Sequence, residues 1–157
     1  MPKPRILDVG QCGADHPAIS GMLRKAFDAE VDGADTHKEA LDALRAGRFD
    51  LVLVNRVGDL DGASGLSLIR AIKADPALAE TPVMLVSNLA DAQAEAVAAG
   101  ALPGFGKSEL GHRRHCRTCD RNVRLHRRPR QPDARMCVRL AGELAGIEPD
   151  ASARSAR

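Results

Sequence analysis

The chain has 157 residues, which is enough for one domain with a sizeable core and too short for two full ones. Hydrophobic residues make up 44% of it, but Trp and Tyr are absent and Phe occurs three times, so we expect a core of Leu, Val, Ile and Ala. No apolar run is long enough to span a membrane, and the N-terminal residues do not have the pattern of a signal peptide, so a cytoplasmic protein is expected.

The net charge of +2 combines two differently charged parts. Residues 1–110 contain 11 Lys and Arg against 16 Asp and Glu, whereas residues 111–157 contain 12 Arg, no Lys and 5 acidic residues. The composition changes abruptly near Gly111, after which Cys, His, Pro and Arg are frequent. We therefore expect one domain over residues 4–110 and a separate basic tail over residues 111–157.

Two strand–helix pairs are predicted at the start of the chain. Residues 6–9 form a short strand interrupted by a charged residue, followed by a loop and a helix that Asp15 or His16 caps. Residues 31–34 form a weaker second strand. Thr36-His37-Lys38-Glu39 has the spacing of a capping box, which predicts the start of a second helix.

The stretch from Leu51 to Val54 is the strand around which we expect the function to be organised. Four consecutive apolar residues are too short for a helix and too apolar for a sheet with one exposed face, so helices should cover both faces. Asn55 closes this strand. Because ligands of open α/β sheets bind at the carboxyl ends of the strands, Asn55 is the first candidate for a functional residue.

The rest of the domain repeats the alternation of strand and helix. We place a helix at 65–74, a buried strand at 82–87 that closes in Ser87, a helix from its cap Asp91 to Gly100, and a strand at 102–105 that leads to Lys107. Five strands alternating with four helices predict an α/β fold with a doubly wound parallel sheet.

These segments together resemble the receiver domain of two-component response regulators, over roughly residues 4–110. Phe49-Asp50-Leu51-Val52-Leu53-Val54 is similar to the family's third strand, and Asp61-Gly62 followed by Gly65-Leu66-Ser67-Leu68-Ile69-Arg70 resembles its loop and third helix. Thr81-Pro82-Val83-Met84-Leu85-Val86-Ser87 resembles its fourth strand, and Phe105-Gly106-Lys107 its fifth strand and lysine. The resemblance implies a flavodoxin-like receiver fold and a phosphorelay signalling module whose partner is a histidine kinase or an effector.

The resemblance also identifies residues that depart from the family's pattern. The family's chemistry requires an aspartate where Asn55 stands, and two acidic residues where Gly10 and Gln11 stand. A carboxamide is not a usable nucleophile toward a phosphoryl group, and Gly-Gln cannot supply the anionic oxygens that Mg²⁺ prefers. Ser87 resembles the switch hydroxyl and Lys107 the phosphate-binding lysine. We expect a pseudo-receiver that is neither phosphorylated nor an enzyme and has no cofactor, in which Asn55 keeps the shape of Asp and makes hydrogen bonds.

Other interpretations of this region stay open. Asn55 could be a polar strand end in a domain that kept its fold and lost its function. Asp59 and Asp61 could supply replacement carboxylates, although Asp and Gly in loops mostly form turns. The stretch Ala101-Leu102-Pro103-Gly104-Phe105-Gly106-Lys107-Ser108 fits a relaxed phosphate-binding loop of a nucleotide-binding enzyme. We discount it because its centre should be a strand and Pro103 removes one N–H.

The tail over residues 111–157 admits three interpretations. Thiolates and imidazoles at short spacing could hold zinc: His112, His115, Cys116, Cys119 and His126. The Arg-rich run could bind nucleic acid through phosphate contacts, and without aromatic residues such binding would be non-specific. The composition also changes just where the family's last helix should begin, as expected if a GC-rich gene is read out of frame. We therefore expect a tail that is either disordered or out of frame.

Overall fold

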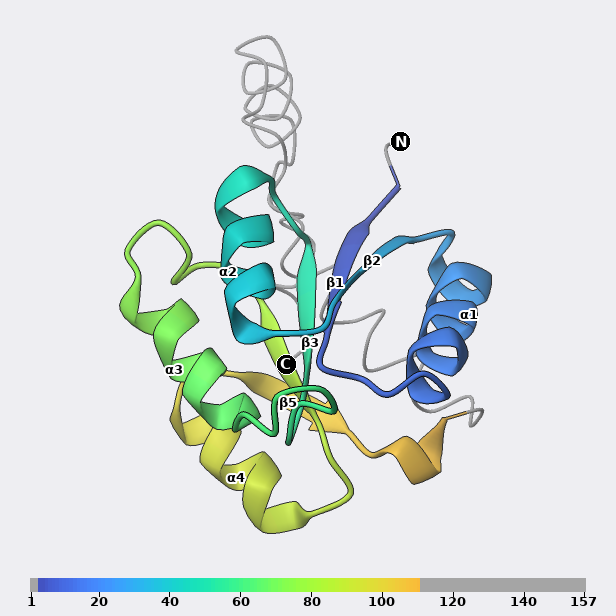
Figure 1. Cartoon of the computed structure of the whole chain (residues 1–157). Helices are drawn as coiled ribbons and strands as arrows, with labels where there is room; N and C mark the ends of the chain where they lie inside the picture. The colour runs from blue at the N-terminus through green and yellow to red at the C-terminus, as the bar shows by residue number, and fades with distance from the viewer. Residues whose placement is uncertain (1–2, 111–157) are drawn as a thin grey trace, which may run out of the picture. The chain divides into compact units, whose positions relative to one another are not determined.

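A computed structural model of the chain describes residues 3–110, and these residues form one parallel sheet flanked by helices (Figure 1). The sheet order is β2-β1-β3-β4-β5. The strands are β1 (Arg5–Val9), β2 (Glu30–Ala34), β3 (Leu51–Asn55), β4 (Val83–Val86) and β5 (Leu102–Phe105). Every pairing is parallel. The predicted doubly wound α/β fold of the flavodoxin-like receiver type is confirmed.

Helices cover both faces of the sheet, as the apolar run in β3 predicts. They are α1 (Asp15–Phe27), α2 (His37–Ala46), α3 (Gly65–Ala74) and α4 (Ala90–Ala98), with a short 3₁₀ helix η1 (Lys107–Glu109) after β5. In Figure 1, α2, α3 and α4 lie on one side of the sheet and α1 on the other. Along β3, Val52 and Val54 belong to the core under α2–α4, whereas Leu51 and Leu53 belong to the core under α1. Alternate apolar residues of β1, β3 and β4 thus pack on opposite layers.

The helix starts were predicted with mixed success. The predicted start of α2 with Thr36 as its cap is confirmed, because the Thr36 side chain accepts a hydrogen bond from the Glu39 N–H at 3.2 Å. The Glu39 carboxylate accepts from the N–H of Asp35, one residue before the N-cap, and not from that of Thr36 as in a complete capping box. The prediction that Asp15 or His16 caps α1 is wrong, since the N-cap is Ala14 and makes no side-chain cap bond. Asp15 is the first helical residue, and its carboxylate bonds to side chains outside α1.

The predicted cap of α4 is also wrong. Its N-cap is Leu89, and Asp91 lies in the first turn. The N–H of Leu89 instead donates to Ser87 Oγ at 3.1 Å, so the residue that follows β4 organises the loop into α4.

The predicted tail is not part of the described structure. The zinc candidates His112, His115, Cys116, Cys119 and His126, with the rest of residues 111–157, lie outside the described residues. Within residues 3–110, no helix has both the length and the hydropathy needed to cross a membrane.

Candidate functional site at the carboxyl edge of the sheet

The five positions singled out by the resemblance all follow the carboxyl ends of strands. Gly10 and Gln11 come directly after β1, Asn55 ends β3, Ser87 follows β4 and Lys107 begins η1 after β5. Because the strands are parallel and β1 lies next to β3, these ends meet at one edge of the sheet. The structure therefore places all five at the edge where ligands of such sheets bind.

Asn55 is joined to the loops after β1 and β3 by its side-chain amide. Its Nδ2 donates to the carbonyl oxygen of Gly10 at 2.8 Å and to that of Val57 at 2.7 Å. A carboxylate has no N–H to donate, so an aspartate here would place an anionic oxygen against two carbonyl oxygens unless a cation lay between them. The amide nitrogen of Asn55 thus supplies the positive end that a bridging cation would otherwise supply.

The backbone at Gly10 supports this arrangement. Gly10 has φ +71°, a left-handed conformation that residues with a side chain rarely adopt. A Cβ on it would lie 3.1 Å from Cα of Gly58. Its carbonyl oxygen also accepts from the N–H of Asp59 at 3.1 Å. An aspartate at position 10 would therefore strain the loop that holds Asn55.

The start of α3 lies directly against the backbone of Asn55. Gly65 is buried, and a Cβ on it would overlap the carbonyl oxygen of Asn55. The N–H of Gly65 donates to the carbonyl oxygen of Arg56 at 2.8 Å. Glycine at position 65 is what allows α3 to begin so close to the end of β3.

Lys107 makes an ion pair with a carboxylate of α1. Its Nζ lies 2.6 Å from Asp15 Oδ2, which also accepts a hydrogen bond from Cys12 Sγ at 3.1 Å. The Lys107 ammonium, with the Cys12 thiol as second donor, holds the pKa of Asp15 below its usual value. The lysine that resembles the phosphate-binding lysine is thus paired with Asp15, a residue that sequence reasoning took for a helix cap.

Ser87 has a structural role in the described part of the chain. It is buried, its Oγ accepts from the Leu89 N–H, and its own N–H donates to the carbonyl oxygen of Phe105 at 2.9 Å. Asp61, a candidate replacement carboxylate, accepts a hydrogen bond from the Ala63 N–H at 2.9 Å and so closes a turn, as Asp in a Gly-containing loop usually does.

Sequence reasoning missed a buried carboxyl group inside β1. Asp8 is 1% exposed, and its Oδ2 lies 2.7 Å from Nδ1 of His16 on α1. Burial raises the pKa of Asp8 to about 6, and the hydrogen bond with His16 opposes this rise. The imidazole fits because Gly33 has no Cβ, which would lie 3.2 Å from His16 Cε1. A charged residue within an apolar strand was the signal that a partner was needed.

The other ring nitrogen of His16 lies 3.4 Å from Ser20 Oγ. The three side chains therefore stand in the order carboxylate, imidazole, hydroxyl, which is the order found in serine hydrolases. Ser20 is one of the buried residues of α1 and is only 2% exposed, so its hydroxyl cannot reach a substrate. We interpret the series as a polar support between β1 and α1.

A cleft of about 490 Å³ opens beside this support. Asp8 and Gln11 lie deep in its wall, and Asp35, Asp59 and Leu60 lie at its exposed rim. Both polar side-chain atoms of Gln11, and Oδ1 of Asp8, are buried without a hydrogen-bond partner among the described residues. The Gln11 amide is near enough to lower the pKa of Asp8, although no hydrogen bond of good geometry joins them.

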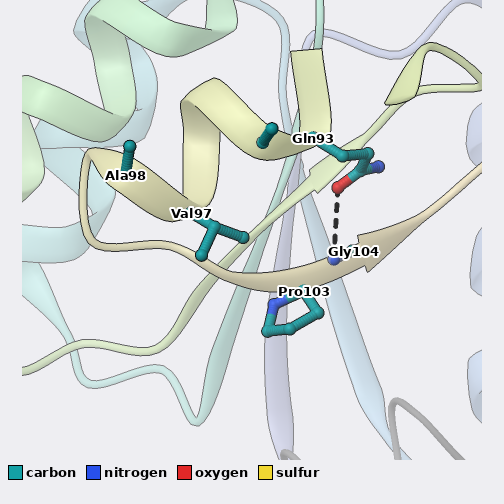
Figure 2. Close-up of a pocket in the computed structure, with 6 residues that line it drawn as sticks. Gln93, Val97, Ala98, Pro103 and Gly104 are labelled. Atoms are coloured by element: carbon teal, nitrogen blue, oxygen red, sulfur yellow. Dashed lines mark hydrogen bonds between the residues drawn. The ribbon is translucent and has the colours of Figure 1, made fainter. Parts of the chain in front are cut away.

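A second hollow, shown in Figure 2, lies between α4 and β5. Its lining is apolar apart from Gln93, whose Oε1 accepts from the N–H of Gly104 at 3.2 Å. Gln93 Nε2 donates to the carbonyl oxygens of Leu85 and Ser87, both at 3.0 Å. One side chain of α4 thus joins β4 to β5 where their register shifts. Nothing in the sequence pattern indicated this role.

The residues at this edge do not fit the magnesium site that the family's chemistry implies. Gly10 and Gln11 provide no carboxylate, and Asn55 points N–H groups, not oxygen, at the neighbouring carbonyls. Between residues 3 and 110 no three His, Cys, Asp or Glu side chains are grouped so as to hold a metal ion.

Comparisons with known proteins agree with the fold. No family model matches the chain. It is 35% identical over 97 residues to the gliding motility regulatory protein of Myxococcus xanthus, covering 60% of this chain and 12% of that protein. It is 30% identical over 83 residues to chemotaxis protein CheY of Pseudomonas aeruginosa, covering 53% of this chain and 65% of that protein. The chain thus spans less than two thirds of the length of either relative.

Solved structures are similar over most of the chain. The signal receiver domain of a DNA binding response regulator protein from Colwellia psychrerythraea superposes with a TM-score of 0.67 and 26% identity, covering 78% of this chain and 99% of that one. The sheet order, the arrangement of its carboxyl edge and these similarities together show that residues 3–110 have the fold of the receiver domains of response regulators.

Proposed function

We propose that this chain is a receiver module of a two-component pathway that works in the cytoplasm by protein contact, without aspartyl phosphorylation. The observation that carries the proposal is the pair of hydrogen bonds from the Asn55 amide to the carbonyl oxygens of Gly10 and Val57. These bonds hold together the two loops that a metal ion and a carboxylate would otherwise join. The site therefore has one stable arrangement that needs neither.

Three features of the site support the proposal. The side chain at position 55 is an amide, which is a poor nucleophile toward phosphorus. The two positions after β1 lack carboxylates, so divalent metal has no anionic ligand there. Lys107 is paired with Asp15, so a phosphoryl group would compete with a carboxylate for its ammonium.

The partner is a signalling protein, either a histidine kinase or an effector. We place its contact surface at the strand ends around Gln11, Asn55, Ser87 and Lys107, together with α4. On α4, Val97 is 43% exposed, and the preceding Leu89 is 53% exposed. These two side chains would add apolar contact area to the polar strand ends.

The test is incubation with acetyl phosphate and Mg²⁺ followed by intact mass measurement, with a receiver that retains the aspartate treated in parallel. We expect the phosphoryl mass on the reference protein and not on this chain. A phosphoryl mass on this chain that disappears in Asn55→Ala would refute the proposal.

A further inference from the structure

The cleft beside the Asp8–His16 pair is separate from the Asn55 contacts. It is lined by the loops after β1, β2 and β3, and by the first turn of α1. Its volume of about 490 Å³ lies within the range of small-molecule sites. It also opens at the carboxyl edge, next to the β1–β3 boundary where the strand order reverses, which is where doubly wound sheets bind ligands.

The deep wall of the cleft contains polar groups that need partners. Gln11 is 8% exposed, yet neither its Oε1 nor its Nε2 has a hydrogen-bond partner among residues 3–110, and the same holds for Asp8 Oδ1. Buried polar groups in folded proteins are nearly always hydrogen-bonded. The Gln11 NH₂ is near enough to Asp8 to lower its pKa, which leaves Gln11 Oε1 as the acceptor whose partner should bring N–H or O–H donors.

The charge of the cleft indicates a cation. Asp8, Asp35 and Asp59 line it, and its lining includes no Lys or Arg. The ammonium of Lys107, at the same edge of the sheet, is held by Asp15. His16 is a further titratable side chain of the wall, and its Nδ1 is hydrogen-bonded to the Asp8 carboxyl group. The described acidic groups are not clustered as metal ligands, which favours an organic cation over a metal ion.

We propose that this cleft binds a small organic cation with several N–H donors, of the guanidinium class. A planar guanidinium presents adjacent donors that can serve two acceptors at once, here Gln11 Oε1 and a carboxylate oxygen. Binding requires the Gln11 side chain to turn its amide toward the cleft. Leu60, which is 72% exposed at the rim, would cover the hydrocarbon part of the ligand.

The site would give the module an input that does not depend on phosphoryl transfer. The cleft can be tested separately from the phosphorylation site, because neither Asn55 nor Lys107 lines it. Phosphorylation of the chain by acetyl phosphate would refute the proposed function, but it would not contradict binding of a cation in the cleft.

The experiment is a titration of the full chain with agmatine, followed by ¹H–¹⁵N NMR. We expect saturable shifts at the backbone N–H groups of residues 11–13, 33–35 and 59–60. The double variant Asp35→Asn/Asp59→Asn changes only exposed side chains and should weaken binding about tenfold or more, as should Gln11→Met. Asp42→Asn, on α2 and outside the cleft, should bind as the parent does.

Three results would overturn the inference. The first is the absence of saturable shifts from agmatine in a folded chain. The second is an equal pattern of shifts from MgCl₂, which would make the cleft an unselective acidic surface. The third is agmatine binding that all the cleft variants retain unchanged.

Discussion

At the scale of single residues, a carboxamide at the end of β3 can make contacts that a carboxylate cannot. Asn55 uses its nitrogen for both of its contacts with neighbouring loops. Asn88 lies at the same edge, and its oxygen accepts from the N–H and the hydroxyl of Ser108. Replacement by aspartate should therefore lower the stability of the fold at Asn55 and have little effect on it at Asn88.

Asn55→Asp should lower the free energy of unfolding by about 1–3 kcal/mol at neutral pH, because it loses two donated hydrogen bonds and sets a charge against two carbonyl oxygens. Asn88→Asp should have little effect, since a carboxylate can accept the same bonds. Urea unfolding of both variants provides the comparison. Equal stability of the two variants would remove the special role given to the Asn55 amide.

A second residue-scale prediction concerns Asp8. Its pKa in the fold, about 6, lies above the ordinary value of 3.8, so the folded protein holds this proton more tightly than the unfolded chain. The stability that this contributes is present below about pH 4 and is lost as the pH rises through about 6. Compared with Asp8→Asn, the parent should lose about 1–3 kcal/mol of stability between these limits.

The measurement is the difference in urea unfolding free energy between the parent and Asp8→Asn across that pH range. Taking the difference cancels groups that do not contact Asp8, including Asp15, whose lowered pKa acts in the opposite direction. A difference that stays constant with pH would show that Asp8 does not titrate in this window.

At the scale of elements, the edge between β4 and β5 depends on one side chain of α4. β5 contains Pro103, which lacks an N–H, and the pairing with β4 shifts register between Met84 and Val86. Gln93 bonds to both strands and to Ser87 at this place. Its amide supplies contacts that a regular ladder would have made.

Gln93→Ala should therefore destabilise the domain by about 1–3 kcal/mol, because the carbonyl oxygens of Leu85 in β4 and of Ser87 just after it lose this donor. Glu95→Ala is the matched control on the same helix, since Glu95 is exposed and alanine favours helix. Thermal and urea unfolding of both variants test this. Similar effects of the two substitutions would contradict the role given to Gln93.

At the scale of the whole molecule, the alternation of buried strands and amphipathic helices was enough to predict the sheet. The run Leu51 to Val54 required cover on both faces, and the structure provides it. The pairing of Lys107 with Asp15 could not be predicted, because the two residues are 92 positions apart and either could have served a local role. The cleft was missed for a similar reason, since its walls come from loops whose approach depends on the packing of Gly33 and Gly10.

The central claim is that the carboxyl edge is held in one arrangement by Asn55 and does not respond to phosphoryl donors. The side-chain NH₂ of Asn55 provides a direct probe, because it gives its own pair of signals in a ¹H–¹⁵N spectrum. We predict that these signals, and the backbone signals of Ser87 and Lys107, keep their positions when acetyl phosphate and Mg²⁺ are added together. A shift of the Asn55 side-chain signals that requires both reagents would contradict this claim.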